Sequence, residues 1–178
     1  DSMSLAATGT EKRGAGAGGR AGGGTAEKNA AVATNEIENI ITASIDGATV
    51  TTAGALSVSA PSDAGLDTLA VGGSGAGTFA LGGSVSLNDI ANTVEATITG
   101  AASVDAGAVS LAASDSSTIE AIAGGIAASG GASFGAAVAT NEINNTIAAR
   151  VDGSTVTGAL TLAAASEATV KSITLGGS

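Results

Sequence analysis

The sequence lacks histidine, cysteine, tryptophan and tyrosine altogether, and its 178 residues include one proline and two phenylalanines. Without cysteine there is no disulfide, and no thiolate to bind a metal or attack a substrate. Without histidine, and with only six lysines and arginines, no general base for a serine nucleophile is evident. We therefore expect no enzyme activity, no catalytic residues, no metal site and no other cofactor.

Large side chains and positive charge are also scarce. Alanine and β-branched residues supply most of the apolar content, so the core must be narrow to be packed to native density. No run of 18 apolar residues occurs, which argues against membrane insertion as a helix. Residues 29–178 hold thirteen acidic residues against Arg150 and Lys171, and an acidic body of this kind repels nucleic acid and anionic membranes. We expect no nucleic-acid partner.

What the chain does contain is a repeat with a period of 53 residues. The copies read NEIENIITASIDG from Asn35, NDIANTVEATITG from Asn88 and NEINNTIAARVDG from Asn141. A repeat of this length predicts a stacked array in which each unit buries the face of its neighbour. Equivalent apolar positions are the expected core anchors: Ile37, Ile90 and Ile143, then Ile45, Ile98 and Val151.

Alternation of residue type predicts that the repeats are built of β-strands. In segment 92–98 the asparagine, valine, alanine and isoleucine face one way, and the threonines and glutamate face the other. Turns are predicted at Asp46-Gly47, Asp152-Gly153, Gly72-Gly73, Gly82-Gly83, Gly124-Gly125 and Pro61. Repetition at constant phase favours a parallel solenoid over antiparallel hairpins, and short strands predict two or three coils per repeat, in a rod of roughly 30–50 Å.

The repeat divides the chain into one continuous solenoid. We assign residues 1–10 to the end of a partial repeat, 29–81 to repeat 1, 82–134 to repeat 2 and 135–178 to a partial repeat 3. Segment 11–28, EKRGAGAGGRAGGGTAEK, lacks the apolar anchors and is interpreted as a degenerate Gly-rich polar coil or loop, with a polar cap or inter-subunit contact as the alternative. Its glycines follow no predicted strand and precede no helix, which argues against a dinucleotide site.

Two sets of polar residues recur with the repeat. Asn39, Asn92 and Asn145 share the inward parity of isoleucine and valine, so we expect structural hydrogen bonds to the backbone of the next coil. The alternative for them is a ligand contact. Carboxylates on or beside the outward parity could serve acid–base chemistry or bind Ca²⁺, but a solvated face that blocks edge pairing is the better interpretation. They are Glu36, Glu38, Asp89, Glu95 and Glu142.

The phrase GGSVSLNDIANTVEATITGA, followed by an ALSVSA-type strand and an S-D-x-x-x-I-x-A-x-A-G-G segment, resembles the repeats of giant bacterial surface and exported proteins. These are β-strand-repeat proteins, filamentous-haemagglutinin-like adhesins and autotransporter passengers. The resemblance covers about residues 30–178. It implies a right-handed parallel β-solenoid that is extracellular or attached to the bacterial surface, serving as a stalk, adhesin or matrix fibre. Its implied partners are other copies or flanking repeats bound by coil stacking, with a host-cell, matrix or glycan surface left open.

Three other functions compete with a structural fibre or adhesin segment. A self-assembling extracellular filament needs end coils that stack between subunits. A polysaccharide-active β-helix enzyme needs acids grouped with basic residues and aromatic platforms, which are scarce here. An ice-binding solenoid is suggested by threonines but opposed by copy two: the threonines are Thr49, Thr51, Thr52, Thr155 and Thr157, and copy two has Ala102, Ser103 and Asp105.

Overall fold

The structure, a computed structural model, describes residues 2–7 and 9–178. These residues form eleven β-strands and no helix, so the expected all-β class is confirmed. Every pairing between the strands is parallel. The strands are β1 (Met3–Ala6), β2 (Gly9–Gly22), β3 (Ala26–Ile37), β4 (Ile40–Asp46), β5 (Thr49–Ala76), β6 (Phe79–Ile90), β7 (Thr93–Thr99), β8 (Ser103–Ser129), β9 (Ala132–Ile143), β10 (Thr146–Val151) and β11 (Thr155–Gly177).

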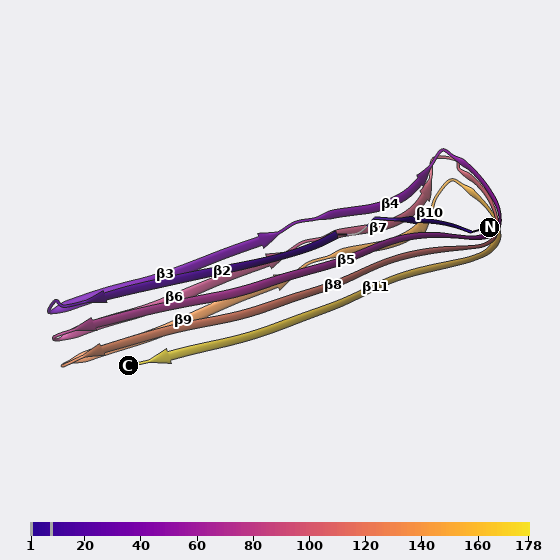
Figure 1. Cartoon of the computed structure of the whole chain (residues 1–178). Coiled ribbons are helices and arrows are strands. Elements are labelled where there is room, and N and C mark those ends of the chain that lie inside the picture. The colour runs from indigo at the N-terminus through magenta and orange to yellow at the C-terminus, as the bar shows by residue number, and fades with distance from the viewer. Residues whose placement is uncertain (1, 8) are drawn as a thin grey trace.

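Each turn of the chain consists of one long strand and two shorter strands that return along it (Figure 1). Sheet A contains β1, β2, β5, β8 and β11, sheet B contains β3, β6 and β9, and sheet C contains β4, β7 and β10. Sheet A covers one face of the molecule along its length, and sheets B and C share the other face. Parallel strands in stacked sheets are compatible with a β-solenoid.

Strand partners lie 53 residues apart over most of the molecule, as in Asn35↔Asn88 and Asn88↔Asn141. The expectation of two or three coils between such positions is therefore wrong, because they are direct neighbours, about 4.8 Å apart. The reason is strand length. With β5 at 28 residues, one coil is about 90 Å long, and the molecule is extended along its strands instead of along the coil axis.

Glycine pairs that predicted turns lie inside strands instead. Gly72-Gly73, Gly82-Gly83 and Gly124-Gly125 belong to β5, β6 and β8, so those turn predictions are wrong. A Cβ atom on Gly72 would lie 1.8 Å from the carbonyl oxygen of Gly83, and one on Gly82 would lie 2.2 Å from that of Ile126. These glycines let the two facing sheets approach until their backbones touch.

The other turn predictions have mixed outcomes. The turns at Asp46-Gly47 and Asp152-Gly153 are confirmed, with φ of 59° at Gly47 and 57° at Gly153, where the missing Cβ removes the steric penalty. Pro61 lies within β5, so a turn there is wrong. It falls where β5 changes partner, because pairing with β1 ends at Ser59 and pairing with β2 begins at Ser62.

Segment 11–28 contributes to regular strands, since β2 pairs with β5 from Gly9↔Ser62 to Gly22↔Gly75. The expected repeat boundaries at 28/29, 81/82 and 134/135 fall inside β3, β6 and β9.

The apolar core has two clusters, and both lie between sheet A and the sheets opposite. The base, where sheet C faces residues 49–60, 103–113 and 155–164 of sheet A, contains Ile45 and Ile98 among leucines and valines. The second cluster contains Ile37 and Ile90 and marks the beginning of the arm, where sheet B faces the rest of sheet A. Ile143 and Val151, on the last coil, are half-buried and pack against these clusters.

Candidate functional site

Asn39, Asn92 and Asn145 lie where the returning chain passes from sheet B to sheet C. The backbone N–H of Asn39 donates to Asn92 Oδ1 at 3.1 Å, and the N–H of Asn92 donates to Asn145 Oδ1 at 2.8 Å. The strand ladder continues around these bonds, because the N–H of Thr93 donates to the Asn39 carbonyl at 2.8 Å. The side chains of Asn92 and Asn145 therefore replace a backbone acceptor at the break between two strands. We call this set the junction ladder.

The junction ladder leads to a buried carboxylate. Asp115, on β8, is 2% exposed and accepts from Asn145 Nδ2 at 2.6 Å, Ser117 Oγ at 2.7 Å and Asn92 Nδ2 at 3.4 Å. Neighbouring strands carry Ser62 and Ser166 at the same register position. A carboxyl group is tolerated in the interior when hydrogen bonds replace the water it loses, and three donors do this for Asp115. Asp115 was not predicted from the sequence. Its inward orientation follows from the alternation of side chains along β8, and the length of β8 was not predicted.

A second asparagine ladder runs parallel to the first in sheet B. Asn35 Nδ2 donates to Asn88 Oδ1 at 2.8 Å, and Asn88 Nδ2 donates to Asn141 Oδ1 at 2.7 Å. Thr68 of sheet A joins it by donating its hydroxyl to Asn88 Oδ1 at 2.6 Å. We call this set the amide ladder. The sequence reading used these asparagines as markers of the repeat but assigned them no role, although their identity in three copies at inward parity was a usable signal.

The predicted acidic face exists as a row on the outer side of sheet B. Glu36, Asp89 and Glu142 are register partners on β3, β6 and β9, beside a shallow groove of about 310 Å³. Glu95 points outward from β7, 3.9 Å from Arg150 on the next strand. Among the described residues, no group of three or more acidic side chains is arranged to hold a metal ion.

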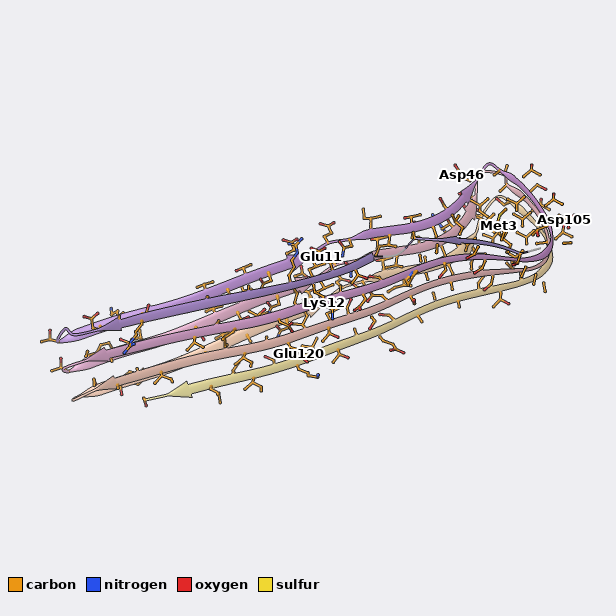
Figure 2. The ribbon with its side chains drawn as sticks, viewed as in Figure 1. Met3, Glu11, Lys12, Asp46, Asp105 and Glu120 are labelled. Atoms are coloured by element: carbon orange, nitrogen blue, oxygen red, sulfur yellow. The ribbon has the colours of Figure 1, made fainter. Side chains whose placement is uncertain are left out.

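Charged side chains also cover the N-terminal edge of the arm core. Arg13 lies in register with Leu66 and Ile119, at an inward position, and pairs with Glu11. The Arg13 guanidinium also donates to the carbonyl oxygen of Glu36 at 3.1 Å. Glu11 and Lys12 lie midway along the molecule, on opposite sides of β2 (Figure 2). This arrangement resembles the polar terminal coil that repeat proteins use to cover a core, and we call it the N-terminal cap.

The junction ladder, the amide ladder and the cap make structural hydrogen bonds, and no described residue is a histidine or cysteine that could add a base or thiolate. A scan of protein-family models, a search of curated proteins and a search of solved structures each returned no match. In the described part of the chain, no helix has the length and apolar character needed to cross a membrane.

Proposed function

We propose that this chain is a non-catalytic structural segment of a bacterial extracellular or cell-surface fibre or adhesin, folded as a right-handed β-solenoid of 53-residue coils. The observation that supports it is that the strand pairings of each sheet join corresponding segments of successive coils. Such a stack leaves two open edges, one made by β1, β2, β3 and β4 and the other by β9, β10 and β11. Unpaired edges of parallel sheets are surfaces to which a further coil can add.

The C-terminal edge is the apolar one. Leu160, Leu162 and Val170 occupy inward register positions on β11 and are 44%, 47% and 49% exposed, whereas their partners on β8 are buried. The amide ladder also ends at this edge with an unused donor, since Asn141 Nδ2 has no acceptor among the described residues. Another coil of the same kind would cover the apolar side chains and accept this bond.

The N-terminal edge opposes stacking between separate chains. In a head-to-tail stack of two copies, Val170 would fall beside Arg13, because both occupy the row of Leu66 and Ile119. Burying a guanidinium costs several kcal/mol unless every donor is satisfied. Flanking repeats of a stalk therefore fit the C-terminal edge better than a second copy does.

A pair of variants tests the role of the C-terminal edge. Leu162→Lys places a charge at an inward position of β11, whereas Thr161→Lys adds the same charge to the adjacent outward position. Sedimentation of the chain at rising concentration should show association of the wild type and of Thr161→Lys that is at least tenfold weaker in Leu162→Lys, in which coil addition at the edge is blocked. Equal association of the two variants would show that the C-terminal edge does not mediate the contact, contrary to the proposal.

A self-assembling filament of separate chains is the second candidate. It is favoured by complementary ladder ends, because Asn141 Nδ2 is an open donor and Asn35 Oδ1 an open acceptor among the described residues. Replacing Arg13 by leucine separates the two candidates. A stalk predicts weak association that strengthens at least tenfold in Arg13→Leu, whereas a filament predicts tight association that this change leaves unaltered. Neither candidate predicts glycan cleavage, and cleavage abolished by substituting Glu95 or Glu142 would contradict both.

A further inference from the structure

Beyond the buried cluster at its beginning, the arm carries its large apolar side chains on the outside. In the base, β5 points Leu56 and Val58 inward and serines outward, but from Leu69 onward this order is inverted. Ala70, Gly72 and Ser74 point inward, while Leu69 and Val71 are 49% and 39% exposed. The alternation continues without a bulge through this part of β5, so the inversion lies in the sequence and not in a shift of the strand.

The interior of the arm has no room for the larger side chains. A Cβ on Gly125 would lie 2.0 Å from the carbonyl oxygen of Ala136, and one on Gly135 would lie 2.0 Å from that of Gly177. If the strands were rotated by 180° about their axes, leucine and isoleucine side chains would occupy the inward positions of these glycines, where even a methyl group clashes. The outer apolar faces are therefore a consequence of close packing between sheets A and B.

Each outer face of the arm is a substantial apolar patch. The A face consists of Leu69, Val71, Ile122, Ile126, Ile173 and Leu175, which are 39% to 64% exposed. The B face consists of Val32, Leu81, Leu87, Phe134 and Val138, which are 38% to 60% exposed. The largest patch on a typical monomer measures about 300–600 Å². A stable interface buries about 800 Å² per partner. The six large side chains of the A face, all at least 39% exposed, supply much of the apolar area that such a contact needs.

The two faces match each other row by row. Inside the arm, the Thr68 hydroxyl donates to Asn88 and Gly72 lies against Gly83. These two contacts show which residues of sheets A and B lie at the same height along the arm. The row containing Leu69, Ile122 and Ile173 therefore lies at the level of Leu87 on the opposite face. Likewise, the row of Val71 and Leu175 lies at the level of the row of Val85 and Val138. A second copy displaced perpendicular to the sheets would place the row of Val71 and Leu175 on a row of three valines. It would place Leu69, Ile122 and Ile173 on Leu87, which is flanked by Thr34 and Thr140.

We infer that the arm stacks on other copies of this chain, with the A face of one molecule against the B face of the next. This contact is lateral and distinct from coil addition at the edges. Because the two surfaces differ, the interface is heterologous and does not close after two subunits, so it yields an open series.

Charge gives the contact a defined salt dependence. The row next to the A-face patch contains Asp67, Glu120 and Lys171, and it lies at the level of the row of Glu36, Asp89 and Glu142 on the B side. Stacking places these mainly acidic rows opposite each other. Screening of the repulsion should therefore strengthen association, since the Debye length falls from about 30 Å at about 0.01 M salt to about 3 Å at about 1 M.

The test uses the Leu162→Lys chain, in which association through the edge is blocked, so that failure of this inference is distinct from failure of the proposed function. The A-face variant adds Ile122→Thr and Ile173→Thr, and the B-face variant adds Leu87→Thr and Val138→Thr. Threonine keeps the β-branched shape suited to strands while removing apolar area. Ile40→Thr, at a site 77% exposed on β4 outside both faces, is the matched control.

Sedimentation should show larger assemblies at about 1 M salt than at about 0.01 M for the parent chain and for the control. Each face variant should associate at least tenfold more weakly, because the interface loses several buried apolar groups. A mixture of the two variants should give a one-to-one dimer and nothing larger, since one intact A face meets one intact B face.

Four results would overturn the inference. These are monomers at both salt concentrations, association that the face variants leave unchanged, equal weakening by Ile40→Thr, and variants that fail to combine when mixed. Binding of the monomer to phosphatidylcholine vesicles without self-association would assign the faces to lipid instead.

Discussion

Replacing Asn92 by alanine tests whether the junction ladder stabilises the stack. Asn92 is 1% exposed, accepts from the N–H of Asn39 and donates to Asp115. Its removal leaves the half-buried Asn39 N–H without an acceptor, at a cost of about 1 kcal/mol, and the lost bond to Asp115 costs a similar or smaller amount because it is long. The cavity left by the amide adds about 1 kcal/mol. We therefore expect a total of about 2–3 kcal/mol.

The assay is urea unfolding followed by circular dichroism, with the midpoint compared at unchanged slope. Thr93→Ala, the next residue along but on the opposite face, is the control and should change the unfolding free energy by less than about 0.5 kcal/mol. Asn92→Asp should be at least as destabilising as alanine, since it keeps the acceptor for Asn39 but places a carboxylate beside Asp115. A neutral Asn92→Ala, or a control that costs as much, would refute the reasoning.

Two further predictions concern packing and charge. Gly72→Ala should destabilise by at least about 2–3 kcal/mol, because its Cβ would overlap the Gly83 carbonyl, whereas Gly75→Ala, with nothing within 4 Å, should be nearly neutral in the same urea assay. The hydrogen bond that Lys171 donates to Glu120, followed by the negative charge of Glu120, raises the pKa of Lys171 above its ordinary value of 10.5. The contribution of Lys171 to stability is therefore present below pH 10.5 and lost as pH rises beyond it. Because solvent screens this exposed pair, the contribution is too small to measure, so Lys171→Ala should leave the unfolding midpoint at pH 7 unchanged, and a clear shift would contradict this.

The parity of side chains could be predicted from the sequence, but the length of the strands could not. Alternation placed Asn92 and Ile98 inward and Thr93 outward, because alternate residues of a strand face opposite sides. In the structure Asn92 and Ile98 are buried, whereas Thr93 is half-buried. The Gly72-Gly73 pair misled the reading, since glycine serves equally in a turn and in a close contact between backbones. Only the residue facing it decides between the two, and that residue lies in another strand.

The candidate site shows the same limit. The inward position of Asn39 and Asn145 followed from the repeat, but their connection to Asp115 did not, because Asp115 occurs in one copy and is aligned with serines in its neighbours. A repeat-based reading finds what the copies share. It does not find a group that acts in one coil alone.

The base and the arm differ in what stabilises them. In the base, burying a leucine, isoleucine or valine contributes about 1.5–3 kcal/mol for each side chain. In the arm beyond the cluster of Ile37 and Ile90, the interior holds alanine, glycine and serine, which contribute much less apolar area, so strand pairing and the amide ladder must supply more of the stability there. The largest apolar groups of the arm are those left on its surface. Covering them by another molecule would therefore supply the burial that the base obtains from its own core, and stacking of arms would stabilise the part of the chain that needs it most.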